Sequence, residues 1–225
     1  MTPVPAVPSL APPFGPEPGR DCPRCPRLVA FRHAQRATHP GWWNAPVPAF
    51  GDPHAWLAVV GLAPGRTGAN RTGRPFTGDH AGWLLFGTLL KLGLARGHYD
   101  PDGRDDLALV GCAILNPVRC VPPGNRPEPA EIAACRPFFE GALAALPRLT
   151  TLVALGTVAH AAVLRAHGAR PSHHGFAHGM VHALPGGRTL IDSFHCSRLN
   201  TNTGRLTPAM FEAVFAAALD TRRAD

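Results

Sequence analysis

Short apolar runs alternate with helical segments along most of this sequence, and that order restricts the folds open to it. Four runs have the length and β-branched content of buried strands: residues 56–60, 107–115, 151–155 and 189–194. Four segments have helical apolar spacing, an early proline or a high alanine content: residues 83–94, 129–146, 157–167 and 208–219. Strands that alternate with helices favour a parallel sheet covered on both faces. We therefore predict a single-domain α/β fold, with a central, mostly parallel four-stranded sheet flanked by helices on both faces.

The length of 225 residues suits one such domain preceded by a tail. Residues 1–20 are rich in proline and carry no apolar run behind a basic start, so we expect a disordered tail rather than a secretory signal. The folded domain is then expected over residues 21–225. Glycine, proline or charge interrupts every candidate for the roughly 20 apolar residues of a membrane span. We expect a cytoplasmic monomer with neither a membrane partner nor an obligate protein partner.

The charge balance makes nucleic acid the first partner to consider. Lys and Arg together number 22 against 15 Asp and Glu, which gives a formal net charge of +7. A positively charged surface attracts polyanions. Arg-rich composition also arises in proteins that bind no DNA, so the charge needs the support of a motif.

The spacing of the cysteines predicts a metal centre. In a reducing compartment, six cysteines are more typical of metal ligands, catalytic thiols or buried apolar residues than of disulfides. Cys22 and Cys25 form a C-x2-C pair, while Cys120 and Cys135 lie in a Pro-rich loop and on the helix after it. Four thiolates hold either zinc or an iron–sulfur cluster, and the spacing alone leaves both open.

Residues suited to ligand binding follow the first predicted strand, where parallel sheets bind their ligands. The strand leads into a glycine-rich turn, Gly61-Leu62-Ala63-Pro64-Gly65, and then into residues 70–79, NRTGRPFTGD. Such a turn lets the backbone approach a ligand closely. Phe76 is either a core residue or a platform for a planar base. Asp79 precedes a helix, so it is a helix N-cap, a functional carboxylate or both.

A polar, basic loop follows the last predicted strand over residues 195–207, HCSRLNTNTGRLT. Its hydroxyl, amide and guanidinium groups suit phosphate oxygens. His195 leads the loop from the end of a strand, opposite the first glycine-rich turn. A hydrogen-bond donor at that place can stabilise a developing anion.

These two motifs together resemble the signatures of the family 5 (type B) uracil-DNA glycosylases. Residues 118–127 and the segment up to Cys135 also resemble the cluster segment shared by the family 4 and family 5 enzymes, and the likeness spans about residues 20–220 in the expected order. It implies a glycosylase that excises uracil, and other damaged bases such as hypoxanthine and ethenocytosine, from damaged DNA in base excision repair. It also implies a structural 4Fe-4S cluster on Cys22, Cys25, Cys120 and Cys135. We interpret Cys112 and Cys196 as buried apolar residues outside the cluster.

The catalytic residues expected from this resemblance are His195, Asp79 and Asn125. His195 donates a hydrogen bond to O2 of the leaving base, assisted by backbone N–H groups of the glycine-rich turn. Relatives in other families carry an Asp, Asn or Glu in that turn, where this chain has Leu62 and Ala63. Asp79 is therefore expected to orient water or stabilise the sugar cation. Asn125 is the matching polar candidate, unless it only makes a turn beside Gly124.

The remaining site residues are expected to hold the base and the strand. The base-binding set is Gly61, Leu62, Ala63, Gly65, Phe76 and Asn116. The DNA-binding set is Ser197, Arg198, Leu199, Asn202, Thr203 and Arg205. Within it, Arg198 and Leu199 are the candidate wedge for the vacated stack. Asn116 offers a donor and an acceptor to uracil, or simply ends a strand before Pro117.

Two rival functions stay open at this point. A non-catalytic protein that binds damaged or single-stranded DNA would keep the fold and the basic face without releasing a base. A cluster-containing redox protein would need an exposed cluster, whereas a closed set of four cysteines is more typical of a structural centre.

Overall fold

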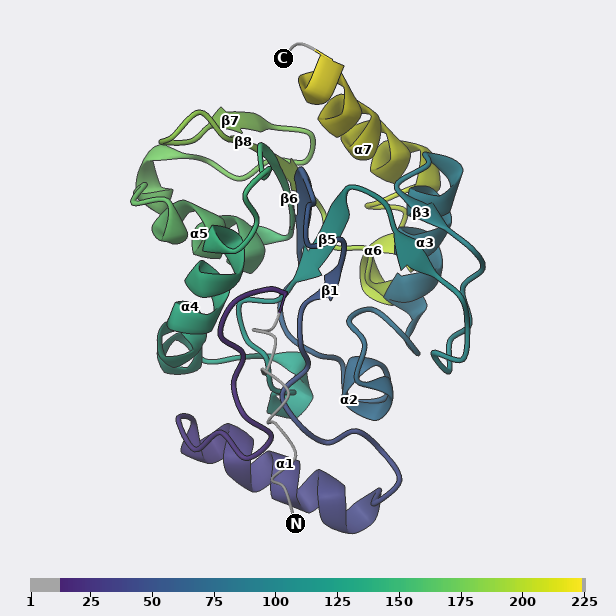
Figure 1. Ribbon diagram of the computed structural model, residues 1–225, viewed down its shortest axis with the longest axis vertical. Helices are drawn as coiled ribbons and strands as arrows, with labels where there is room; N and C mark the ends of the chain where they lie inside the picture. The colour runs from purple at the N-terminus through teal and green to yellow at the C-terminus, as the bar shows by residue number, and fades with distance from the viewer. Residues whose placement is uncertain (1–12, 224–225) are drawn as a thin grey trace, which may run out of the picture.

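A computed structural model describes residues 13–223 and contains a six-stranded sheet in the order β1-β5-β2-β6-β8-β7 (Figure 1). Its four central strands run parallel to one another: β5 (Cys112–Leu115), β2 (Leu57–Val60), β6 (Thr151–Leu155) and β8 (Thr189–Ser193). Two short antiparallel strands close the edges: β1 (Phe50–Gly51) and β7 (Val181–Ala183). The predicted parallel four-stranded sheet is confirmed, with an additional strand at each edge.

The predicted strand over residues 107–115 is wrong in its extent, because Gly111 divides the run. Gly111 has a φ of +60°, and a Cβ atom there would press against the indole of Trp56. The chain therefore leaves one ladder and enters another. The first part, β4 (Ala108–Leu109), pairs antiparallel with β3 (Ala95–Arg96), whereas β5 joins the main sheet.

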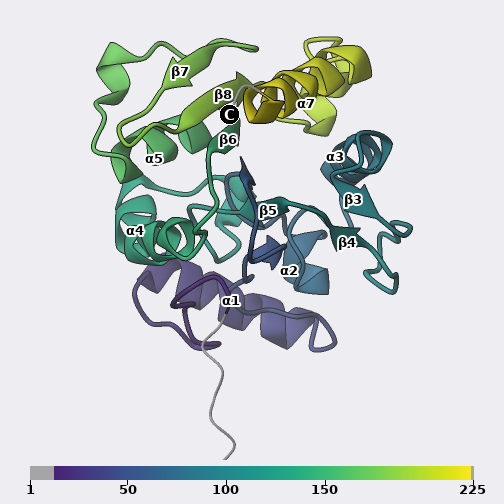
Figure 2. The same ribbon diagram turned by 45° about the horizontal axis from the view of Figure 1, so that its top comes forward.

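The helices cover the sheet in two layers, each with its own apolar core (Figure 2). On one face, α3 (His80–Lys91) and α7 (Pro208–Arg223) pack on strand residues such as Leu57 and Val59. On the other face, α4 (Pro129–Ala144) and α5 (Thr157–Ala166) pack on the alternate residues of the same strands. Side chains therefore point to both faces in turn, and every residue of the four central strands except Thr189 is buried.

Short helices carry the connections. They are α2 (Ala69–Thr72), η1 (Pro123–Asn125), η2 (Pro171–His173) and α6 (Arg198–Asn202). The helix predicted from residue 83 begins three residues earlier at His80, because the side chain of Asp79 accepts a hydrogen bond from the Gly82 N–H and caps it. No helix within residues 13–223 is long and apolar enough to cross a membrane.

The N-terminal segment corrects the expected disordered tail. Residues 1–12 lie outside the described part, but residues 13–20 pack on the domain. Phe14 is buried, and Pro16 lies against Gly141 of α4. The Glu17 carboxylate accepts from the Ala49 N–H at 3.1 Å and lies 3.2 Å from Arg119. These contacts order residues 13–20, although their proline content had predicted a disordered tail. The segment leads into α1 (Pro26–Thr38), which lies at the bottom of the molecule in Figure 1.

Candidate active site

A cleft of about 1020 Å³ opens at the carboxyl ends of β2, β5 and β8. It is lined by the loops that follow these strands, the start of α3 and the turn η1. Of the predicted site residues, the lining includes Leu62, Ala63, Gly65, Phe76, Asp79, Asn116, Asn125, His195, Ser197, Arg198 and Leu199. Segments more than 100 residues apart in the sequence meet here because they follow neighbouring parallel strands.

Phe76 and His195 stack on each other inside the cleft. Their ring centroids lie 5.9 Å apart with an interplanar angle of 25°. Burial lowers the pKa of His195 to about 4, so its imidazole is neutral at pH 7 and can still donate an N–H. The Asn200 side chain donates to the His195 carbonyl at 2.8 Å, which ties His195 to α6.

Phe76 adopts a backbone conformation that L-residues rarely take. Its φ is +54°, and its carbonyl accepts a hydrogen bond from the Tyr99 hydroxyl at 3.4 Å. A non-glycine residue with positive φ is strained and persists where its surroundings hold it. The strain turns the ring into the cleft, and the ring is 7% exposed. Phe76 is thus part of the apolar core and of the cleft wall at once.

Asn116 lines the floor of the cleft, whereas Gly61 lies behind it, against Asn116 and Phe76, and is not part of the lining. A Cβ atom on Gly61 would collide with the Asn116 side-chain oxygen and would lie 2.9 Å from the Phe76 ring, so only glycine fits there. Asn116 is 3% exposed, and its Oδ1 has no hydrogen-bond partner among the described residues. A buried acceptor without a partner is costly in an isolated protein and suits a site that receives a ligand.

The glycine-rich turn offers fewer donors than its sequence suggested. The Gly61 N–H already donates to the Leu115 carbonyl at 2.9 Å within the sheet, and Pro64 has no N–H. The backbone donors left for an anion are those of Leu62, Ala63 and Gly65. Gly61 contributes space rather than a hydrogen bond.

Asp79 and Asn125 both line the cleft, and each also makes a structural contact. Asp79 caps α3 and also approaches the glycine-rich loop: a Cβ atom on Gly65 would lie 2.9 Å from its Oδ2. Burial raises the pKa of Asp79 above its usual range. Asn125 has a φ of +56° in a turn, and its Oδ1 accepts from the Arg66 N–H at 3.3 Å, so it joins the loop after β5 to the loop after β2.

The rim of the cleft on α6 carries part of the predicted DNA-binding set. Leu199 is 72% exposed and lines the cleft beside Ser197 and Arg198. Asn202, Thr203 and Arg205 lie outside the lining. The Arg205 guanidinium stacks 4.3 Å from the centre of the Phe194 ring.

The structure adds lining residues that the sequence did not single out: Thr67, His80, Trp83, Pro101 and Arg126. Trp83 is the largest of them and is 58% exposed. The sequence carried no clear signal for it, because the predicted helix began at residue 83 and left its position relative to Asp79 open. By contrast, the two arginines of the first motif form internal ion pairs and are not part of the cleft lining: Arg71 pairs with Asp102, and Arg74 forms a bidentate pair with Asp105.

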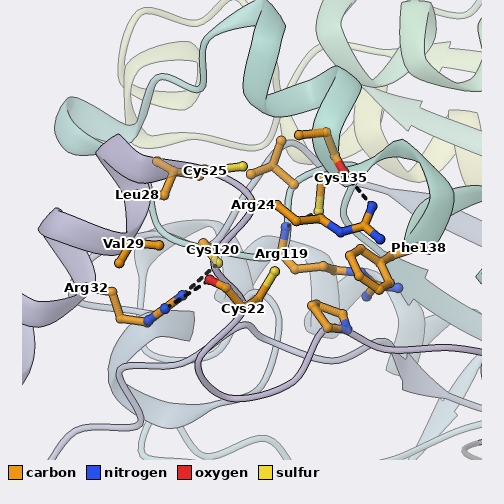
Figure 3. Close-up of a pocket in the computed structure, with 13 residues that line it drawn as sticks. Cys22, Arg24, Cys25, Leu28, Val29, Arg32, Arg119, Cys120, Cys135 and Phe138 are labelled. Atoms are coloured by element: carbon orange, nitrogen blue, oxygen red, sulfur yellow. Dashed lines mark hydrogen bonds between the residues drawn. The ribbon is translucent and has the colours of Figure 1, made fainter.

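The four cysteines of the predicted metal set line a second, smaller pocket between α1, the loop after β5 and α4 (Figure 3). Arg32 donates to the Cys120 sulfur at 3.7 Å, and the Arg119 N–H donates to the Cys135 sulfur at 3.4 Å. Burial raises the pKa of the Cys120 thiol to about 12 and that of the Cys135 thiol to about 11. Cys112 and Cys196 lie fully buried in the apolar core instead.

Two buried guanidinium groups accompany these cysteines. Arg32 is 2% exposed and Arg119 is 1% exposed. The Arg32 Nε and all three side-chain nitrogens of Arg119 make no hydrogen bond within the described residues, although Arg119 lies near the Glu17 carboxylate. Buried cations require compensating negative charge, which Glu17 supplies in part to Arg119 and the exposed Asp21 in part to Arg32.

The cysteine sulfurs are spread more widely than the ligands of one metal ion. Within residues 13–223, one group of three potential ligand side chains has all its ligand atoms within 4.8 Å of one another: His160, His182 and Asp192. The four cysteines form no such group. Sulfurs around a single tetrahedral zinc ion would lie about 3.8 Å apart, from a Zn–S bond of about 2.3 Å. In the His–Asp group, both imidazoles contact the buried Asp192 carboxylate at hydrogen-bond distances of 2.8 and 2.9 Å.

The parallel α/β sheet carries a histidine, a stacked phenylalanine and a partly buried carboxylate at its strand ends, an arrangement typical of an enzyme that acts on a planar base. Residues 48–219 match the family model described as the uracil DNA glycosylase superfamily. The chain belongs to this superfamily and, within it, to the type-5 uracil-DNA glycosylases.

Three relatives carry the description type-5 uracil-DNA glycosylase. The protein from Thermus thermophilus is 47% identical over 202 residues, which cover 88% of this chain and 92% of that protein. The protein from Pyrobaculum aerophilum is 43% identical over 206 residues, covering 89% of each chain. The protein from Mycobacterium tuberculosis is 40% identical over 208 residues, covering 88% of this chain and 76% of that protein.

Proposed function

We propose that this protein excises uracil from DNA by hydrolysing the N-glycosidic bond, as the first step of base excision repair. The observation that carries the proposal is the floor of the cleft, where the Phe76–His195 stack lies beside the unpartnered Asn116 oxygen. An aromatic face and one buried polar edge are what a flipped base requires. The names of the relatives support the same reaction.

His195 stabilises the leaving base. Bond cleavage leaves negative charge on the uracil ring, and a neutral imidazole N–H donates to O2 as that charge develops. The backbone N–H groups of Leu62, Ala63 and Gly65 are the donors available to assist. One well-placed donor in a site of this kind is worth about 3–4 kcal/mol of barrier.

Asp79 acts on the sugar side of the bond. Its carboxylate, held at the start of α3, orients the attacking water or stabilises the cationic sugar once it is ionised. Asn125 reaches the same cleft from η1 and is the polar partner available to that water. Leu62 and Ala63, which replace the carboxylate or amide of other families, leave this role to Asp79.

Asn116 reads the base. Its buried Oδ1 is an acceptor that suits N3–H of uracil, and its amide nitrogen suits a carbonyl on the same edge. Asn116→Ala should therefore lower the rate of uracil excision more than the rate of hypoxanthine excision. Equal losses on both bases would remove the base-reading role. Excision of hypoxanthine and ethenocytosine is part of the proposal, because the Phe76 face accepts any planar ring.

Base release from oligonucleotides tests the function directly. Substrates carry uracil, hypoxanthine or ethenocytosine opposite each normal base or in a single strand, with His195→Ala as the control. Release by the wild type that His195→Ala has lost supports the glycosylase. Tight binding without release by the wild type would establish a DNA-binding protein in its place.

We propose that Cys22, Cys25, Cys120 and Cys135 hold a structural 4Fe-4S cluster. Three observations support this set: one pocket joins all four, no three of their sulfurs lie within 4.8 Å of one another among the described residues, and two buried guanidinium groups lie beside them. The thiolates and the cluster together carry the negative charge that these cations need. A cluster held by these thiolates would cross-link the segment before α1, the loop leading to Asn125 and α4.

The cellular setting follows from this chemistry. Thiolate ligands persist in a reducing compartment, so we place the protein in the cytoplasm with access to DNA. We propose that it acts as a monomer.

A further inference from the structure

Trp83 is an exposed aromatic residue at the rim of the cleft. The indole is 58% exposed and lines the cleft one helical turn beyond Asp79, on the same face of α3. Nothing in the excision step described above uses it. A large aromatic ring left in water beside a binding site is a candidate contact for a ligand.

One aromatic neighbour contacts the Trp83 ring and restricts its position. Trp83 meets Tyr99 in a T-shaped contact, with ring centroids 5.1 Å apart and an interplanar angle of 90°. The Tyr99 hydroxyl in turn accepts from the Gly78 N–H at 3.3 Å and donates to the Phe76 carbonyl. Trp83 is therefore braced by the residue that also holds the base-stacking loop, and it pays little conformational entropy on binding a flat partner.

The surroundings suit a nucleotide. Pro101 and His80 line the cleft with Trp83, and Arg126 and Arg198 supply positive charge along the same lining. The His80 ring contacts the Thr201 hydroxyl at 2.9 Å, which connects the start of α3 to α6, where Leu199 forms the other exposed apolar part of the rim. Guanidinium groups suit backbone phosphates, and an aromatic face suits a base of any sequence.

Flipping uracil out of a strand also leaves its neighbours without a stacking partner on one side. Leu199 is an aliphatic side chain that can fill the gap but presents no flat face. Trp83 presents one, outside the pocket that the flipped uracil occupies.

We propose that Trp83 forms a second base-binding subsite, which stacks on the base adjacent to the excised uracil on the same strand. This inference rests on the proposed function and adds to it a contact with the neighbouring nucleotide. Because Trp83 lies at the rim rather than at the floor, it contributes to substrate binding and leaves the chemical step unchanged.

The test combines two variants with modified substrates. Trp83→Ala and Trp83→Phe are compared with the wild type on single-stranded oligonucleotides in which the base before or after uracil is present or replaced by an abasic analogue. On intact substrate, Trp83→Ala should raise KM about 10-fold, the scale of losing one aromatic–base stack, with kcat nearly unchanged. Trp83→Phe, which keeps the aromatic contact with Tyr99, should recover most of that loss.

The substrate series separates stacking from a general structural effect. When the stacked neighbour is abasic, wild type and Trp83→Ala should have the same KM, because the contact is already missing. An uncleavable uracil substrate should quench part of the tryptophan fluorescence of the wild type. This quenching should be smaller in Trp83→Phe but unchanged in the control Trp43→Phe, because the Trp43 indole of the wild type donates to the Pro46 carbonyl away from the cleft. A KM increase in Trp83→Ala that persists with both abasic neighbours, or unchanged KM, would overturn the subsite.

The outcomes for the two proposals differ. If the wild type releases no base, the proposed function fails, while Trp83-dependent quenching by DNA still supports the subsite. If release is normal and Trp83→Ala matches the wild type throughout, the subsite fails and the glycosylase stands.

Discussion

Replacing His195 with glutamine should make the folded protein less sensitive to acid. Burial lowers the pKa of His195 to about 4 from its usual 6.5, whereas in the unfolded chain the ring takes up its proton near 6.5. Between these values the unfolded state binds a proton that the folded state excludes. The stability associated with His195 is therefore complete above pH 6.5 and is lost as the pH falls toward 4.

The size of the effect follows from the two pKa values. At pH 5 the neutral, partly buried ring lowers the free energy of unfolding by about 2 kcal/mol relative to a residue that does not titrate. Urea unfolding of the wild type and of His195→Gln at pH 7 and pH 5 measures this difference, because all other titrating groups are common to both proteins. We expect the wild type to lose about 2 kcal/mol more than the variant between the two pH values. Parallel losses would refute the assignment of a neutral, partly buried imidazole to the cleft.

Three further predictions concern the carboxylates and the cysteines. Asp79→Asn should lower kcat for uracil release about 100-fold. Burial raises the pKa of Asp79, so the wild-type rate should fall on the acid side at a pH above the usual Asp pKa, as this group protonates. The variant should lack this fall in rate. If the variant keeps it, another group is responsible. Asp105→Asn should cost about 3–5 kcal/mol in the free energy of unfolding, because it leaves the Arg74 guanidinium without its bidentate partner. The pairing holds the pKa of Asp105 at about 2, so the stability that this pair contributes to the wild type is lost only as the pH falls below about 4. A small loss of unfolding free energy in Asp105→Asn at pH 7 would contradict the pairing. Cys120→Ser should lose bound iron and lower the Tm, whereas Cys112→Ala, in the apolar core, should keep the iron; iron content and visible absorption separate the two, and full iron in Cys120→Ser would exclude this ligand set.

Local sequence patterns determined the central sheet and the location of the site. The parallel strands β2, β6 and β8 coincide closely with apolar runs, because a strand buried on both faces needs consecutive apolar residues. The motifs that begin at Gly61 and His195 follow two of those strands, so sheet topology alone predicted that they meet. The cysteine spacing likewise predicted four residues that the structure brings to one pocket.

Long-range contacts decided what those patterns left open. Phe76 belongs to both the core and the cleft, since Tyr99, 23 residues away, holds it at a positive φ. Residues 13–20 pack on the domain because Arg119 and Gly141 meet them from distant segments. The fold likewise places Arg74 against Asp105, 31 residues away in the sequence.

By itself, then, the sequence determined the strand–helix order, the family motifs and the chemical types gathered at the site. Only the tertiary structure decided which of those side chains face the cleft, which are consumed by internal pairs, and that Trp83 is left exposed at its rim. The physical reason is that periodicity and propensity are properties of neighbouring residues, whereas burial, ion pairing and the loss of a partner depend on segments that meet only in the folded chain.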